Sequence, residues 1–429
     1  MPPDRLAAIR AIEALRCGVP NAAAVSLLGC GQPEVLARFH AALTAAQSRR
    51  GKDTQAEGLV IQGGFGAGKS HTLRYLEGLA LEKGFVCSKF SISKETPLHD
   101  PAKICREAMY TAKLPDRRGS ALQEIVSKLD LRSKAFTDFV RWAERSACSQ
   151  LVATLFLVQH KRSDRELVER ITRFWSGDGM GVQEIRQHLA TIPNSPHYSF
   201  PTMRARDLGI EKIRFAARLM SAADYAGWVI LFDEVELIGC YGLLQRAKSY
   251  AEIARFSGRL PQTMPGILAV FAVTDDFVSA ILYGKRDLTA IPAMGHVGYQ
   301  DGIPSAHAVA GMDAIRQKAT ALRQSTPEQL LHTLERVTKL YVNAYGWQPP
   351  ATTPEATLLS TRMRQHLKGW IYRWDLARMC GVSDTIEAAE LTTNYAEAPE
   401  RQGASVEDDL ISDLAEILTS STINARDER

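Results

Sequence analysis

Residues 63–70 form the run Gly63-Gly64-Phe65-Gly66-Ala67-Gly68-Lys69-Ser70, which matches the pattern G-x-x-x-x-G-K-[ST] at every required position. The glycines let the backbone turn tightly, so that successive N–H groups face a phosphate. A helix expected to begin at about Lys69 directs its positive dipole end at the same anion. Lys69 then supplies a charge to the β- and γ-phosphates, and Ser70 offers a hydroxyl to Mg²⁺. The run therefore predicts a phosphate-binding loop. The residues expected to bind the nucleotide are Gly63, Gly64, Phe65, Gly66, Ala67, Gly68, Lys69, Ser70 and His71.

Short apolar runs on both sides of this loop predict a parallel β-sheet. Leu59-Val60-Ile61 precedes the loop, and its length and apolar character are typical of a buried parallel strand. A helix to about Lys83 follows, and residues 85–92 predict a second strand, which completes one βαβ unit. Two further buried strands are expected at 228–232 and 267–273. The chain is therefore predicted to have an α/β fold.

Two acidic residues follow the apolar strand at 228–232. An enzyme with this loop needs a carboxylate at the end of a neighbouring buried strand, so we assign Asp233 to Mg²⁺. We assign Glu234 to orienting or deprotonating the attacking water. Without the glycine-rich loop, the same pattern would describe a strand that ends in solvated carboxylates. Glu236 is expected to be a surface residue or to lie behind the site.

The strand at 267–273 ends in further polar residues. Thr274 is the candidate to hold the lytic water or to sense the γ-phosphate, with Asp275 second. An ordinary N-cap for the next helix explains Thr274 equally well. Hydrolysis of this kind also uses an arginine against the charge of the transition state. The candidates, each equally consistent with a solvated surface residue, are Arg255, Arg259, Arg286, Arg362 and Arg364.

The rest of the 429 residues is predicted to be mainly helical. Residues 1–50 are predicted to form N-terminal helices. Residues 51–305 are predicted to form the core around the glycine-rich loop, and this core contains a helical insertion at 98–226. Residues 306–383 predict a helical, winged-helix-like C-terminal domain, in which the Trp370–Trp374 cluster is expected to be core rather than a stacking surface. Residues 384–429 hold 12 acidic and 3 basic residues and predict an acidic tail with an amphipathic helix.

Composition narrows the class of protein. Lys+Arg 52 against Asp+Glu 48 gives a net charge of only +4, so charge alone indicates no strong partner. The sequence contains no apolar run of the ~18 residues that predict a membrane span, and its beginning does not match a signal peptide. Seven dispersed cysteines indicate reduced thiols. We therefore expect a cytoplasmic protein without membrane contact.

Three further segments resemble a known family. Residues 12–20 fit an "I-E-A-L-R-x-G-x-P" signature, Leu28-Gly29-Cys30-Gly31 follows it, and Leu231-Phe232-Asp233-Glu234-Val235-Glu236 surrounds the paired acids. Together with the glycine-rich loop, they resemble the AAA+/STAND branch of P-loop ATPases. Within that branch they are similar to the BREX-system ATP-binding proteins of the BrxD type, which are encoded in bacterial phage-defence islands. The resemblance covers residues 5–275, and more loosely the chain to 380.

The resemblance implies an AAA+-like core that hydrolyses ATP with Mg²⁺, beside other defence proteins such as a large helicase. It also implies that Val19 and Pro20 line an adenine pocket. One departure is that Lys69 and Asp233 lie 164 residues apart, because the helical insertion separates them. No arginine finger can be matched, so assembly into a homo-oligomer stays open.

Several functional hypotheses remain. The first is an ATPase that acts on double-stranded DNA without sequence preference, because residues 91–175 carry 16 basic against 11 acidic residues and residues 311–380 carry 10 against 5. Solvated helix faces explain these charges equally well. The second is an ATP-dependent switch that recruits a protein partner with little turnover, using the acidic tail as a docking element. A small-molecule kinase is disfavoured by the chain length, and no base-reading motif for guanine is present.

Overall fold

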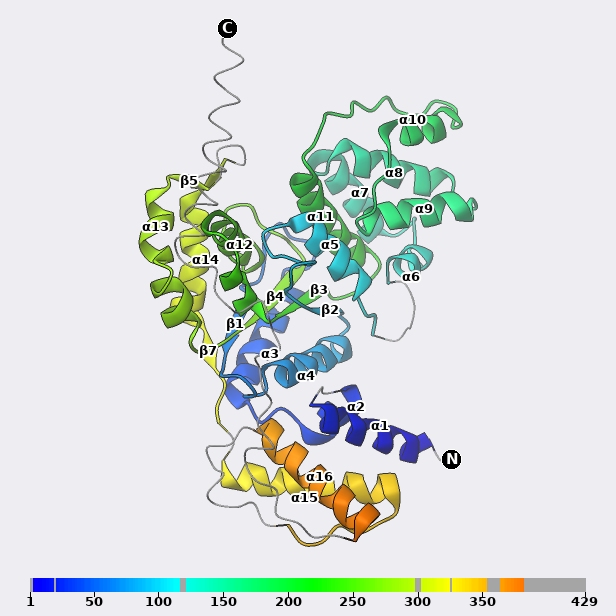
Figure 1. Cartoon of the computed structure of the whole chain (residues 1–429). Coiled ribbons are helices and arrows are strands. Elements are labelled where there is room, and N and C mark those ends of the chain that lie inside the picture. Colours follow the sequence, from blue (N-terminus) through cyan, green and yellow to red (C-terminus); the bar gives the residue numbers. More distant parts are fainter. Residues whose placement is uncertain are drawn as a thin grey trace.

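The computed structural model describes residues 3–18, 21–115, 121–297, 302–324, 326–352 and 363–381. A five-stranded sheet lies at its centre, in the order β2-β3-β4-β1-β7, and all neighbouring strands are parallel (Figure 1). The fold is therefore α/β, as predicted. The strands are β1 (Leu59–Gln62), β2 (Val86–Ser91), β3 (Trp228–Asp233), β4 (Ile267–Val273) and β7 (Thr320–Ala321).

The strand order corrects one expectation. Strand β3, which carries Asp233 at its end, is not beside β1, because β4 lies between them. The link from β1 through α4 (Lys69–Glu82) to β2 consequently passes over two strands. Since all five strands are parallel, their carboxyl ends still meet at one edge of the sheet. Strand β7 was not predicted, because two residues carry no periodicity.

Both faces of the sheet are covered by helices. Val229, Leu231 and Val270 belong to the core cluster that includes side chains of α3 (Pro33–Ser48) and α4. Ile230 and Phe232, one position on, face the opposite cluster with α12 (Leu243–Phe256) and α14 (Ser305–Lys318). Burial on both sides explains why these strands are continuous apolar runs rather than alternating ones.

The predicted helices between 98 and 226 are present. Figure 1 shows α5 and α11 between the sheet and an outer group, α6 to α10. The helices are interrupted at 177–181 and at 192–201. The elements are α5 (Pro101–Tyr110), α6 (Ala121–Lys128), α7 (Lys134–Ser146), α8 (Ser149–His160), α9 (Arg165–Trp175), α10 (Val182–Ala190) and α11 (Ala205–Ala222).

A separate hydrophobic cluster joins the two ends of the described chain. It contains side chains of α1 (Pro3–Cys17), α2 (Ala22–Leu28), α15 (Pro327–Tyr345) and α16 (Met363–Cys380). Trp370 and Trp374 are buried in it, so this cluster is a core, as predicted. A winged-helix arrangement is not shown and stays a prediction, as do the domain boundaries. The acidic tail predicted at 384–429 lies outside the described residues. Among the helices described, none combines the length and apolar character that crossing a bilayer requires.

Beyond β3 the chain runs through η1 (Val235–Cys240) into α12, and beyond β4 through η2 (Val278–Tyr283) and α13 (Asp287–Ala293) to a small hairpin of β5 (His296–Val297) and β6 (Ile303–Pro304). A buried ion pair joins these parts. Arg246 Nη2 lies 2.8 Å from Asp287 Oδ1, and the Tyr250 hydroxyl donates to Asp287 Oδ2 at 2.7 Å. The Asp287 side chain is fully buried, so its charge depends on these donors.

We predict that Asp287→Ala lowers the free energy of unfolding by about 3–5 kcal/mol, because it leaves the Arg246 guanidinium buried without its counter-ion. Urea denaturation followed by circular dichroism measures the change. Asp313→Ala is the matched control, since that carboxylate makes a partly exposed pair with Arg316, and a change within about 0.5 kcal/mol is expected. Equal effects of the two variants would contradict the prediction.

Candidate functional site

The glycine-rich loop (residues 63–70) joins the end of β1 to the start of α4 at the carboxyl edge of the sheet. Gly66 and Gly68 have φ of +76° and +95°, a region that favours glycine. A Cβ on Gly64 would lie 3.2 Å from Asp275 Oδ2, which leaves little room for a side chain. The backbone path of the loop thus requires the glycines that the sequence supplies.

Lys69 is buried at the beginning of α4. Its Nζ donates to Gly63 O at 2.9 Å and lies 3.7 Å from Glu236 Oε1. The ammonium group also lies 5.1 Å from the centre of the Phe65 ring. Burial raises the pKa of the Glu236 carboxyl, and the charge of Lys69 opposes that rise. Of the two places expected for Glu236, the structure shows the buried one behind the loop.

The two predicted acids at the end of β3 differ in environment. Asp233 is buried, and its Oδ1 accepts the Glu234 N–H at 3.1 Å while its Oδ2 lies 3.0 Å from Lys89 Nζ. Glu234 is exposed and has the left-handed backbone φ 54°, ψ 36°. This conformation costs a non-glycine residue about 1–3 kcal/mol and is typical of functional sites. The two adjacent carboxylates are thereby held in different settings at one edge of the sheet.

The polar residues after β4 divide between two places. Asp275 approaches the loop at Gly64, whereas Thr274 is buried and is not among the described residues that line the cavity. The following helix, η2, has Phe277 at its N-cap, so the N-cap role considered for Thr274 is not observed.

The arginine candidates are scattered, and among those described only Arg364 lines the cavity. Arg255 pairs with Glu252 at 2.9 Å, and Arg259 with Glu57 at 2.9 Å. Arg286 is exposed, with φ 57°. Arg362 lies outside the described residues.

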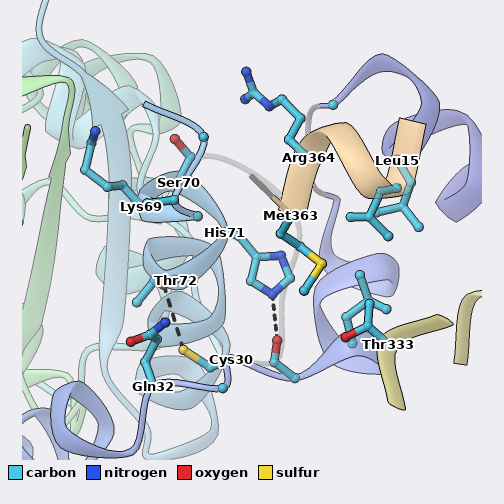
Figure 2. Close-up of a pocket in the computed structure, with 18 of the residues that line it drawn as sticks. Leu15, Cys30, Gln32, Lys69, Ser70, His71, Thr72, Thr333, Met363 and Arg364 are labelled. Carbon is cyan, nitrogen blue, oxygen red and sulfur yellow. Dashed lines mark hydrogen bonds between the residues drawn. The ribbon is translucent and has the colours of Figure 1, made fainter. Parts of the chain in front are cut away.

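A cavity of about 530 Å³ opens beside the loop, between α4 and the helices of both chain ends. In Figure 2, Ser70 and His71 of α4 lie opposite Met363 and Arg364 of α16, with Leu15 of α1 nearby. The cavity lining also includes Asp233, Glu234, Glu236, Gly18, Gly29, Cys30 and Gly31. Val19 and Pro20, the predicted adenine-pocket residues, lie outside the described part of the chain.

One wall of the cavity was missed by the sequence analysis. Gln329, His332, Thr333 and Arg336 lie on a single face of α15, at spacings of three, four and seven residues, and all of them line the cavity. That periodicity shows which residues share a face of the helix. It does not show what the face contacts, so this wall of the cavity could not be predicted.

His71 holds the link between α2 and α3 against the loop. Its Nε2 lies 2.6 Å from Gly29 O, and burial lowers the pKa of the imidazole, which favours the neutral ring (Figure 2). Gln32 anchors the same link further along. It accepts from Arg323 N at 2.8 Å and donates to Arg323 O at 2.9 Å. His71 therefore lies in the cavity lining and also positions residues 29–31, while its role in nucleotide binding stays a prediction.

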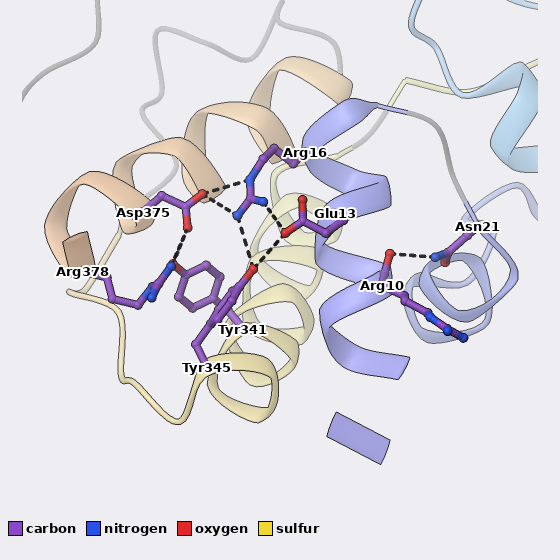
Figure 3. A network of polar contacts seen from close by, with 8 residues as sticks. All are labelled: Arg10, Glu13, Arg16, Asn21, Tyr341, Tyr345, Asp375 and Arg378. Carbon is purple, nitrogen blue, oxygen red and sulfur yellow. Dashed lines mark hydrogen bonds and ion pairs between the residues drawn. The ribbon is translucent and has the colours of Figure 1, made fainter. Parts of the chain in front are cut away.

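A polar network, here called the α1–α16 clasp, fixes the helices that close the cavity (Figure 3). Arg16 donates to Asp375 Oδ2 through Nε at 3.0 Å and through Nη2 at 2.7 Å. The other oxygen of Asp375 accepts from the Tyr341 hydroxyl at 2.7 Å, and Glu13 accepts from Tyr345 at 3.2 Å. The signature at residues 12–16 thus has two uses. Ala14 and Leu15 face the cavity, while Glu13 and Arg16 hold α1 to the C-terminal helices.

Comparison with known proteins gives one match. The family model described as BREX system ATP-binding protein BrxC/D matches residues 4–137 and 207–372. The unmatched interval between these ranges contains α8, α9 and α10, the outer helices of the insertion. Neither the curated proteins nor the solved structures contain a significant match.

We predict that Arg16→Met accelerates hydrogen–deuterium exchange in α1 roughly tenfold, because it removes two charge-assisted hydrogen bonds to Asp375. Mass spectrometry of peptides from residues 5–16 measures the rate. Arg10→Met is the control, since Arg10 is an exposed residue of the same helix. Unchanged exchange in Arg16→Met would show that the apolar cluster alone holds α1.

Proposed function

Because the chain belongs to the BREX system ATP-binding protein BrxC/D family, and so is an ATP-binding protein of the BREX phage-defence system, we propose that it hydrolyses ATP to ADP and phosphate with Mg²⁺. One observation carries the proposal. The glycine-rich loop, Lys69 and the two acids Asp233 and Glu234 all line one cavity, although the acids lie far from the loop in sequence. Family membership also implies that other BREX proteins are its partners.

The triphosphate would lie along the glycine-rich loop. Residues 64–70 line the cavity, and the backbone N–H groups of a glycine-rich loop and of a helix N-terminus favour bound phosphate. Lys69 is the fixed charge beside the β- and γ-phosphates. The apolar side chains of Leu15, Leu28, Met363 and Leu367 line the rest of the cavity and suit a purine base. We assign Val19 and Pro20 to the same base pocket.

The residues present fit a magnesium ion. Asp233 is a buried carboxylate whose Oδ2 already faces a cation, the ammonium of Lys89. Ser70 lines the same cavity at the end of the loop. Ser70 and Asp233 would hold Mg²⁺, which when bound neutralises charge on the phosphate oxygens.

Glu234 is the residue that we propose to orient or deprotonate the attacking water. It is exposed and lines the cavity, where a water-activating carboxylate must lie. Thr274, with Asp275 as the alternative, remains the candidate to hold that water. Arg364 is the arginine that we propose to contact the phosphates within one chain, because it lines the cavity.

We predict that Lys69→Ala abolishes nucleotide binding, whereas Glu234→Gln binds ATP but hydrolyses it at least ~10²-fold more slowly, because only the proton acceptor is lost. Titration with a fluorescent ATP analogue measures binding, and phosphate release measures turnover. Glu95→Gln, an exposed carboxylate outside the cavity lining, is the control for Glu234→Gln. Normal turnover in Glu234→Gln would show that another residue is the base.

DNA action and self-association extend this proposal. The basic excess in the insertion and in residues 311–380 favours contact with the backbone of double-stranded DNA. Exposed Arg286 is available to a second copy in a homo-oligomer, and a helicase is the partner that we propose among the BREX proteins.

A nucleotide-dependent switch with little turnover is the second candidate function. It is favoured by the cavity walls, since helices from both chain ends close over the loop. Bound nucleotide would then change how these helices sit, and a partner protein would recognise the change.

We predict that double-stranded DNA raises the rate of Mg·ATP hydrolysis severalfold, measured with Glu234→Gln as the blank. The expectation rests on the basic excess, and it should weaken as salt rises. A low rate that is indifferent to DNA would favour the switch. In that case Glu234→Gln would retain function in phage defence while Lys69→Ala would lose it.

A further inference from the structure

Two charged residues at or beside the cavity have no role in the proposed hydrolysis: Glu236 lines the cavity, and Lys89 does not line it but pairs with Asp233, which does. Lys89 lies on β2, and Glu236 lies on η1 just after the paired acids. Each forms an ion pair with a residue that we propose to bind a ligand: Lys89 pairs with Asp233, proposed to bind Mg²⁺, and Glu236 pairs with Lys69, proposed to bind phosphate. Lys89 Nζ lies 3.0 Å from Asp233 Oδ2, and Glu236 Oε1 lies 3.7 Å from Lys69 Nζ.

Burial makes these two pairs consequential. The side chains of Lys69 and Glu236 are each 8% exposed, that of Asp233 is 4% exposed and that of Lys89 is 19% exposed. Charges this far from water interact strongly, and each of them needs a counter-ion. The charges of the two lysines are therefore balanced by the two carboxylates with which they pair.

One carboxylate oxygen of Glu236 lacks a hydrogen-bond donor within the described part of the chain. Its Oε2 is buried and has no hydrogen-bond partner among the described residues, although Glu236 lines the cavity. A buried carboxylate oxygen without a donor is costly. The arrangement around Glu236 therefore suits a site in which charges are exchanged, more than a permanent structural ion pair.

We propose that Lys89 and Glu236 are internal counter-ions that make this site selective for the complex of nucleotide and divalent cation over either component alone. The inference rests on the proposed function of the cavity. Nucleotide phosphates on Lys69 would compete with Glu236, and a cation on Asp233 would compete with Lys89. Metal-free nucleotide then meets the negative charge of Glu236, and a free cation meets the positive charge of Lys89. When both components bind together, the charge of the cation offsets the repulsion between Glu236 and the phosphates, and the charge of the phosphates offsets the repulsion between Lys89 and the cation.

The two residues are therefore expected to affect the binding of different ligands. Glu236 weakens the binding of metal-free nucleotide, whereas Lys89 weakens the binding of a cation without nucleotide. Neither effect is expected of a pair that only stabilises the fold, because loss of such a pair lowers stability without raising any affinity.

The test uses the full chain and two probes. A fluorescent ATP analogue in excess EDTA reports metal-free nucleotide binding, and Mn²⁺ titrated alone, followed by electron paramagnetic resonance, reports cation binding. Asp233→Asn defines the Mn²⁺ signal that belongs to this site. We expect Glu236→Gln to tighten analogue binding roughly tenfold or more, and Lys89→Met to tighten Mn²⁺ binding by a similar factor.

Matched variants separate charge from folding. Lys89→Arg keeps the positive charge and should leave Mn²⁺ affinity near that of the wild type. Lys103→Met removes an exposed lysine from α5 and should change neither affinity. If Lys89→Met does not fold, Glu236→Gln alone tests the inference, since that residue changes to a neutral side chain of the same shape.

The outcomes are distinct. Wild-type affinities in both variants, or weaker ones, would overturn the counter-ion role while leaving the proposed ATPase intact. A wild-type chain that binds neither the analogue with Mg²⁺ nor Mn²⁺ would overturn the proposed function and this inference together. The inference would be supported if Glu236→Gln increased the affinity for the ATP analogue alone and Lys89→Met increased the affinity for Mn²⁺ alone.

Discussion

All five strands of the sheet are parallel, and the candidate site depends on that constraint. The carboxyl ends of β1, β3 and β4 meet at one edge, so the glycine-rich loop, Asp233 and Asp275 come together although long segments separate them in the chain. The same edge receives Lys89, from β2. A helical insertion as large as that between β2 and β3 is compatible with the site, because the register of the strands fixes the relative positions of the charged groups and the insertion does not.

A second constraint comes from the apolar cluster that α1 and α2 share with α15 and α16. The edge of the sheet supplies the side of the cavity that holds the glycine-rich loop, and this cluster supplies the opposite wall. The contact between His71 and Gly29 connects the two halves, and the α1–α16 clasp holds the helices of the second half together. Together they explain why the signature at residues 12–20 carries both apolar and charged residues, since some face the cavity and others hold the wall in place.

Much of this site could be predicted from the sequence, for identifiable reasons. The glycine-rich loop and the acids after β3 follow from local patterns, since tight turns and buried strands leave clear marks on composition. The order of the strands could not be predicted, because apolar runs look alike wherever they lie in a sheet. Lys89 was not predicted as part of the site, because a single lysine within a strand has no distinctive spacing. Arg336 was not predicted either, because an amphipathic pattern does not show what a helix face contacts. The family match confirms the resemblance that the sequence suggested, while the roles of individual residues stay predictions.

The α1–α16 clasp also bears on how the protein is made. Arg16 and Asp375 lie 359 positions apart, so a ribosome must synthesise almost the whole described chain before they can meet. Until then α1 has apolar residues such as Ile12 without the partners that bury them in the finished fold. Contacts of this separation form late and leave hydrophobic surface exposed in the meantime. Closure of the cavity is therefore a late step of folding, and a nascent chain holds the glycine-rich loop long before it has the opposite wall of the cavity.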